Sequence, residues 1–394
     1  MNIRTGSAAP RVALRNDPRF RALLYQLVLL ALILWFGYQF AINARTNLQA
    51  QQITGGFGFL ANTAGFGVNQ SLIPYDESDS YGRVFFVGLL NTLLVAGIGV
   101  VLATVLGFLV GIARLSRNWL LARLAGGYVE LIRNLPLLFQ ILFWYLAVLG
   151  TLPGPRQSIS LWGEIFLNNR GLIVPMPVAG KGAGYVVGAF ILGVLATMAL
   201  RSWEKRRQAR TGQRVPLLWA GFLLVIGLPL TIFLVADFPI GFETPELRGF
   251  NFVGGIRLIP EFVALLLALT IYTAAFIAEI VRAGILAVPR GQTEAAFALG
   301  LRRGLTLRLV IVPQALRVIV PPLTNQYLNL TKNSSLAIAV GYPDLFAVFA
   351  GTTLNQTGQA IEIIGITMAV YLCISLLTSA LMNWYNAHIG VAER

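Results

Sequence analysis

The amino-acid sequence predicts an all-α fold, a polytopic membrane helix bundle with about eight transmembrane helices. Of its 394 residues, 56% are hydrophobic and only 12% are charged, and the mean hydropathy is +0.72. This composition is typical of membrane proteins and not of soluble domains. Several apolar runs are long enough to cross the roughly 30 Å hydrocarbon core of a bilayer, so the expected surroundings are membrane lipid.

The charge distribution excludes several other classes of protein. The net charge is +14, but the basic residues cluster between the apolar runs, as the positive-inside rule requires, so no nucleic-acid partner is expected. The chain has one cysteine, Cys373, and one histidine, His388, which leaves no disulfide and no Cys or His metal cluster. It contains no GxxxxGK[ST] stretch to hold ATP. We therefore expect no metal and no cofactor.

The polarity of the loops orients the first three predicted spans. Residues 1–21 are basic, which places the N-terminus in the cytoplasm, before a span at about 22–42. Residues 43–82 are polar and acidic, which marks the outer side. The second span, about 84–113, returns inside, and a third follows with YVELIRNLPLLFQILFWY, residues 128–145.

The second half of the chain predicts five more spans. Residues 151–258 form two of them, about 184–200 and 216–236, joined by the strongly basic stretch 201–214 on the cytoplasmic side. Spans follow at about 259–286 and within 309–350. The latter is interrupted by prolines, so one crossing plus an outer interfacial segment near 343–350 is expected. The last span, about 361–384, puts the C-terminus inside.

The stretch from Glu294 to Pro313 lies between apolar runs but is too charged for lipid. It carries Glu294, Arg302, Arg303 and Arg308. We expect two short helices broken at Gly300 and Gly304, the first with an acidic residue near its N-terminus and the second running into Pro313.

This stretch, EAAFALGLRRGLTLRLVIVP, resembles the EAA loop of ABC importer permeases. That pattern is EAA, three residues, Gly, nine residues and Ile-x-Leu-Pro. The positions in register are Glu294, Ala295, Ala296, Gly300 and Pro313, with Val310 and Val312 in place of Ile and Leu. YVELIRNLPLLFQ resembles a signature of the histidine- and glutamine-type permeases of polar amino acids, although Asn134 and Leu135 replace Gly and Thr. Residues 272–285, 312–326 and 330–337 match the same family.

The resemblance implies a type I ABC importer permease core of a bacterial inner membrane. It divides the chain into an extra span with its outer loop (1–82), a first core part (83–150), an insertion with two extra spans (151–258) and a second core part (259–387) with the EAA loop at 289–313. The insertion is similar to the longer permeases of general L-amino acid systems. Glu294 to Phe297 would dock on a partner, and Gly300 would make the bend.

The same resemblance implies partners. They are a dimer of ABC ATP-binding subunits, a second homologous permease subunit that makes a heterodimer, and a periplasmic amino acid-binding protein. The chain itself would not be an enzyme, because ATP hydrolysis would take place on the separate ATP-binding subunit.

A polar cluster is the candidate for the substrate path. Lys332, Asn333, Ser334 and Ser335 lie in an interrupted apolar stretch with no acid nearby in sequence. An amino acid presents a carboxylate that needs cations or hydrogen-bond donors, although Lys332 could equally snorkel to the interface. Asn91 and Thr92 are weaker candidates, because such groups often bridge membrane helices.

Two pairs of opposite charges have helical spacing. Glu130 and Arg133, and Glu279 and Arg282, stand three residues apart and can pair on one helix face. Since buried charges need partners, a structural role bracing the bundle is favoured over substrate contact.

The competing functional class is an ion-coupled secondary amino acid transporter. It predicts internal repeats, of which the sequence shows no convincing case, and it leaves the EAA loop without a purpose. A membrane enzyme would need a catalytic constellation that the chain does not offer.

Overall fold

A computed structural model describes residues 18–50, 55–211, 217–236 and 240–389. Among these, six helices are long and apolar enough to cross a membrane, at residues 20–40, 81–113, 183–208, 260–286, 303–340 and 360–386. Trp119–Asn134 and Leu137–Leu149 form an apolar helix pair bent by 107°, which is either a broken span or a re-entrant loop, and Trp219–Val235 is a shorter apolar helix. These segments coincide with the eight predicted spans and confirm a membrane helix bundle. Both termini, whose side of the membrane was predicted, lie outside the described residues.

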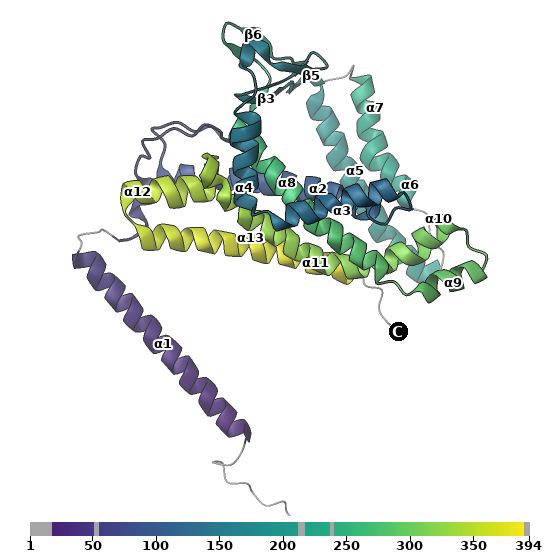
Figure 1. Ribbon diagram of the computed structural model, residues 1–394, viewed down its shortest axis with the longest axis horizontal. Helices are drawn as coiled ribbons and strands as arrows, with labels where there is room; N and C mark the ends of the chain where they lie inside the picture. Colours follow the sequence, from purple (N-terminus) through teal and green to yellow (C-terminus); the bar gives the residue numbers. More distant parts are fainter. Residues whose placement is uncertain (1–17, 51–54, 212–216, 237–239, 390–394) are drawn as a thin grey trace, which may run out of the picture.

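The first helix, α1 (Pro18–Ala50), stands apart from the other helices (Figure 1). None of its apolar stretch is buried inside the chain. A short 3-10 turn, Phe57–Ala61, precedes α2 (Tyr81–Ala113). Ser80 caps α2, since its hydroxyl accepts a hydrogen bond from the amide of Arg83 at 3.4 Å.

The bundle core consists of α2, α8 (Pro260–Leu286) and α11 (Val312–Asn333). Glycines let these helices approach closely. A Cβ on Gly107 of α2 would lie 2.6 Å from Ile277 Cβ of α8, and one on Gly284 of α8 would overlap Ile319 of α11. Helix α3 (Trp119–Asn134) and α4 (Leu137–Leu142), which continues as π-helix through Phe143–Leu149, cover α8.

The insertion contains strands that the sequence analysis did not predict. A four-stranded antiparallel sheet has the order β1 (Ile159–Leu161), β2 (Ile165–Asn168), β3 (Gly171–Val174), β8 (Ile256–Leu258). Two further antiparallel pairs are β4 (Met176–Ala179) with β5 (Ile240–Glu243), which lie on either side of helices α5–α7 in the chain, and β6 (Glu246–Arg248) with β7 (Asn251–Val253), which form a hairpin. Figure 1 shows these sheets at one end of the helical hairpin that follows β4 and precedes β5 in the chain.

That hairpin contains the two extra spans. It consists of α5 (Ala183–Thr211), α6 (Leu217–Phe222), a π-helical segment (Leu223–Gly227) and α7 (Leu228–Val235). Helix α5 runs eleven residues beyond the predicted end at 200, so residues 201–211 of the basic stretch extend the helix and are not a loop.

One crossing was predicted within residues 309–350 and one helical run is found, but the prolines that were expected to interrupt it do not break the helix. Residues 303–340 form one apolar helical run, and Pro321 and Pro322 lie inside α11. The run ends at Gly341, whose φ is +78°. The interfacial position of the segment after it stays a prediction, and its residues Tyr342, Asp344 and Leu345 are fully buried within the chain. It packs against α2 and leads through a π-helical segment (Phe346–Thr353) to α12 (Leu354–Thr357) and α13 (Ala360–Ile389).

Candidate functional site

The loop between α8 and α11 begins with a short exposed helix, α9 (Arg290–Ala298). It ends at Gly300, which adopts the left-handed backbone conformation with φ +77°. The amide of Gly300 donates to the carbonyl of Phe297 at 2.9 Å, and that of Leu301 donates to Ala296 at 3.1 Å. These bonds satisfy the last carbonyls of α9, so glycine makes the bend that separates the two helices.

Two expectations for this loop are wrong. Gly304 does not break the second helix, because it is the second residue of α10 (Arg303–Thr306). That helix passes through a π-helical turn, Leu307–Ile311, directly into α11, so Pro313 lies within a continuous helical run. Glu294 is the fifth residue of α9. It therefore lies beyond the first turn, which is the part of a helix where the dipole stabilises a carboxylate.

The side chains of α9 divide into an inner and an outer set. Ala296 is only 3% exposed and fixes the helix to the rest of the chain, whereas Glu294, Ala295 and Phe297 are exposed. Phe297 is 45% exposed, and Leu299, just beyond the helix, is 82% exposed. An exposed pair of large apolar side chains on a charged loop outside the membrane is suited to contact with another protein.

Hydrogen bonds hold the loop against the base of α11. The side-chain amide of Gln314 donates to that of Gln292 at 3.3 Å, which ties α11 to α9. The Thr306 hydroxyl is buried and donates to the carbonyl of Arg302 at 3.2 Å. A movement of α9 would therefore reach α11 directly.

A three-residue ion cluster lies near the same end of the bundle. The carboxylate of Glu279 contacts Arg282 at 2.6 Å, as the spacing predicts, and also contacts Arg114 beyond the end of α2. Glu130 and Arg133 differ from their expected pairing. Arg133 lies over the ring of Phe276, 5.0 Å from its centroid, and no described residue forms an ion pair with Glu130.

The four polar residues at the end of α11 do not share one face. The exposed Lys332 and the half-buried Ser335 line a cavity of about 390 Å³ against α13, which also includes Thr367 and Tyr371. Ser334 is buried away from it, and its hydroxyl donates to the carbonyl of Thr331 at 2.8 Å. Asn333 is half-buried at the helix end. Lys332 therefore supplies the positively charged side chain that lines this cavity.

Asn91 and Thr92 join α2 to the buried segment after Gly341. The Asn91 amide donates to the carbonyls of Gln70 and Pro343, both at 2.8 Å, and the Thr92 hydroxyl accepts from the amide of Leu345 at 3.0 Å. Both side chains are fully buried. The bonds favour a bridging role for this pair.

Comparison with known proteins assigns the family. The family described as "Binding-protein-dependent transport system inner membrane component" matches residues 189–391, more than half of the chain. The chain belongs to this family. It is a permease of the inner membrane, and its several apolar helices agree with a multi-pass protein.

Relatives match the permease over nearly its whole length. It is 51% identical to the general L-amino acid transport system permease protein AapQ of Rhizobium johnstonii, over 96% of this chain and 94% of that one. It is 54% identical to the amino-acid ABC transporter permease protein YhdX of Escherichia coli, over 96% of each. A crystal structure of an amino acid ABC transporter with histidines covers 78% of this chain and 95% of its own, with 22% identity and a TM-score of 0.46.

One buried acid of the permease was missed by the sequence analysis. Asp344 is fully buried, its carboxylate accepts from the amide of Ala347 at 2.8 Å, and the Tyr371 hydroxyl donates to it at 3.3 Å. No described Lys or Arg forms an ion pair with it. The local signal was Pro-Asp before a helical run, which is typical of an N-terminal cap.

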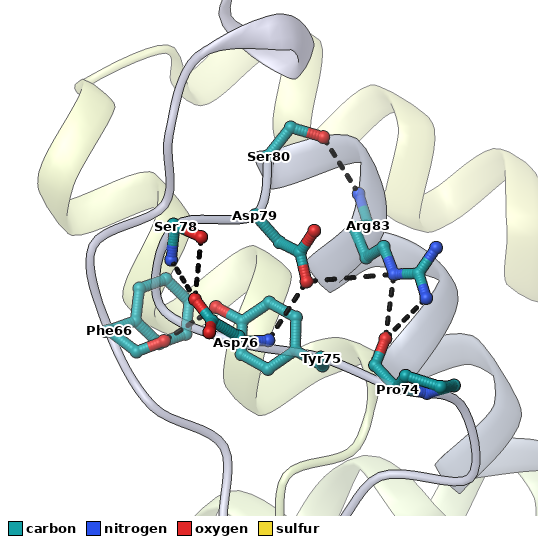
Figure 2. A network of polar contacts seen from close by, with 8 residues as sticks. All are labelled: Phe66, Pro74, Tyr75, Asp76, Ser78, Asp79, Ser80 and Arg83. Atoms are coloured by element: carbon teal, nitrogen blue, oxygen red, sulfur yellow. Dashed lines mark hydrogen bonds and ion pairs between the residues drawn. The ribbon is translucent and has the colours of Figure 1, made fainter.

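The loop before α2 carries an acidic network of polar contacts (Figure 2). The Ser78 amide and hydroxyl both donate to Asp76 at 2.7 Å, and these bonds lower the pKa of that carboxyl. The Arg83 side chain donates to the carbonyl of Pro74 at 2.9 Å. Burial, followed by the nearby charges of Asp79, Glu77 and Asp76, raises the pKa of Tyr75. These bonds thus order the loop at the N-terminal end of α2.

Proposed function

We propose that the chain is a permease subunit of an ATP-driven amino acid importer. With a second, homologous permease subunit it forms the translocation path, which receives amino acids from a periplasmic binding protein. A dimer of ATP-binding subunits on the cytoplasmic side hydrolyses ATP. Amino acids are proposed as substrates because relatives with 45–54% identity are all named as amino acid transport permeases.

The exposed helix α9 is the observation that carries the coupling role. It presents Phe297 and Leu299 to a partner, is closed by Gly300, and is hydrogen-bonded to α11. A single helical run, 303–340, then leads from this loop to Lys332 at the far end of α11. Closure of the ATP-binding subunits on α9 would move this run as one body and alter the cavity beside Lys332.

Lys332 and the cavity beside it supply the proposed contact with substrate. A carboxylate is the group common to all amino acids, and the ammonium group of Lys332 matches it. Ser335, Thr367 and Tyr371 also line the cavity, and their hydroxyls donate to the Lys332 carbonyl, the Ile363 carbonyl and Asp344, which leaves Lys332 as the donor for the carboxylate. Asn91 and Thr92 contribute by holding α2 to the segment that closes the outer end.

Loss of the ATP-binding subunit on mutation of α9 tests the coupling role. Phe297→Asp should abolish co-purification of an ATPase with a Walker A motif, because it places a charge in an apolar contact. Phe242→Asp is the matched control, since Phe242 is 66% exposed on β5, far from α9. An undiminished ATPase yield with Phe297→Asp would contradict the docking role, and uptake driven by an ion gradient without ATP would indicate a secondary transporter.

Labelling of single cysteines tests the orientation. In a Cys373→Ser background, Ser78→Cys should react with an impermeant maleimide in intact spheroplasts. Gln292→Cys, which is exposed in α9, should react only after permeabilisation. Both termini would then be cytoplasmic, and the insertion would add two crossings without reversing the core. Reaction of Gln292→Cys in intact spheroplasts would overturn this arrangement.

A further inference from the structure

A small basic cavity lies in the sheets of the insertion, away from the candidate site. Its volume is about 170 Å³, and Arg170, Arg257, Asn251 and Phe252 contribute to its lining. The β2–β3 turn and β8 belong to the four-stranded sheet, whereas β7 belongs to the separate β6–β7 pair, so the cavity lies where these two sheets meet. No part of the proposed coupling or substrate path uses this cavity.

The fold fixes both arginines in place. Asn168, which is fully buried, accepts from the amide of Arg170 at 2.8 Å and donates to the Ser158 hydroxyl at 2.9 Å. Arg257 stands on β8 opposite Ile173 of β3, and its Nε donates to the carbonyl of Arg170 at 3.2 Å. The two guanidinium groups are therefore directed to one cavity by backbone pairing and not by chance surface contact.

Neither positive charge is neutralised within the described part of the chain. Arg170 donates to the neutral amide oxygen of Asn251, and no carboxylate forms an ion pair with Arg170 or Arg257. By contrast, Arg248 in the same group of strands pairs with Glu246 at 3.1 Å. Glu243 is the acid at the rim, close to Gly254, and it contacts neither arginine.

A third cation stands next to this cavity. Arg156 lies over the ring of Phe250, 4.0 Å from its centroid, and donates to the carbonyl of Gly249 at 3.2 Å. It follows Pro155, which also lines the cavity. Like charges around one cavity repel, and an anion bound there would relieve the repulsion.

We infer that this cavity binds a carboxylate, namely an Asp or Glu side chain of the periplasmic binding protein. The guanidinium fork matches a carboxylate in two parallel hydrogen bonds. The volume is below the roughly 300–1,000 Å³ of small-molecule sites, which favours one inserted side chain over a whole ligand. The sheets lie at the end of α5 and α7 away from α9 (Figure 1). Under the proposed function α9 is cytoplasmic, so the sheets are on the periplasmic side, and the identity of the partner rests on that function.

Binding of the substrate-loaded binding protein to the complete transporter complex in nanodiscs tests this inference. The probe is the system's own binding protein, labelled with a fluorophore and followed by anisotropy at two salt concentrations. Arg170→Gln with Arg257→Gln should weaken binding about tenfold and flatten its salt dependence. The matched control is Arg248→Gln, whose guanidinium already has a carboxylate partner, and it should change Kd less than about twofold.

A charge-preserving double variant separates steering from recognition. Arg170→Lys with Arg257→Lys should retain the salt dependence but recover only part of the affinity, because lysine lacks the fork. An unchanged Kd and salt slope in the double Gln variant would overturn the inference. So would an effect confined to nanodiscs of anionic lipid, which would assign the cavity to lipid phosphates.

A final arm distinguishes a free amino acid from a protein side chain. Glutamate is titrated onto the complex without binding protein by calorimetry. Saturable binding that the double Gln variant loses would assign the cavity to free substrate and overturn the docking role. The ATPase content of each preparation is measured in parallel, so failure of the coupling proposal would be visible as loss of that subunit and would not be confused with loss of docking.

Discussion

Substitution of Gly300 tests the bend between α9 and α10. Its φ is +77°, and no heavy atom lies within 4 Å of the position that a Cβ would take. The cost of a side chain therefore comes from the left-handed backbone and not from crowding within the chain. For an L-residue this cost is about 1–2 kcal/mol, which lowers the population of the bent loop about 5- to 30-fold.

Three substitutions at this position should rank by their tolerance of that backbone. Gly300→Val should reduce the ATP hydrolysis stimulated by loaded binding protein most strongly, and Gly300→Ala by about 5-fold or more. Gly300→Asn should retain most of the stimulation, because Asn enters the left-handed region far more often than other residues. The assay uses the complex reconstituted in liposomes, normalised to the amount of inserted permease.

Two results would refute this reasoning. Equal stimulation in the Val and Asn variants would show that the bend is not needed for coupling. A loss with Asn as deep as that with Val would mean that side-chain volume in a groove of the partner, and not backbone strain, limits the loop.

Three further predictions, each with a substitution for comparison, test the remaining features. Lys332→Met should lower uptake about tenfold or more through loss of a charge-assisted hydrogen bond of about 1.5–3 kcal/mol, and Lys332→Arg should not restore it; near-normal uptake in both would move the substrate site elsewhere. Glu279→Gln should lower the thermal unfolding midpoint in detergent by several degrees, because it leaves two arginines without a carboxylate at a cost of about 1.5–3 kcal/mol, whereas Glu130→Gln should not. Gly284→Ala should destabilise the α8–α11 contact by about 1–3 kcal/mol, whereas Gly97→Ala, which has open space, should not; equal midpoints would contradict the close packing.

Features that depend on local or averaged sequence signals were predictable. The spans follow from hydropathy summed over whole helices, which single residues alter little. The bend at Gly300 follows from a glycine directly after an apolar and charged helical pattern. The seventh span was more continuous than predicted, because neighbouring helices and a π-helical turn accommodate the prolines that would break an isolated helix.

Features that depend on pairing between distant segments were not predictable. The strands of the insertion have three or four residues, too few to show an alternating pattern, and β3 finds its partner β8 only through the fold. The spacing of Glu279 and Arg282 predicts their contact, but the bond with Arg114 joins residues 165 positions apart. Glu130 and Arg133 have the same spacing without the contact, because Phe276 of a neighbouring helix attracts the guanidinium.

The antiparallel pairing of β3 with β8 means that the part of the insertion between these two strands could be removed as a unit. In the observed register Val174 stands opposite Ile256, so the chain leaves and returns at adjacent points. Replacing the residues between these two positions with a two-residue turn would leave an ordinary β-hairpin beside the start of α8. Since the excised segment holds an even number of proposed crossings, α8 and everything after it would keep their direction through the bilayer.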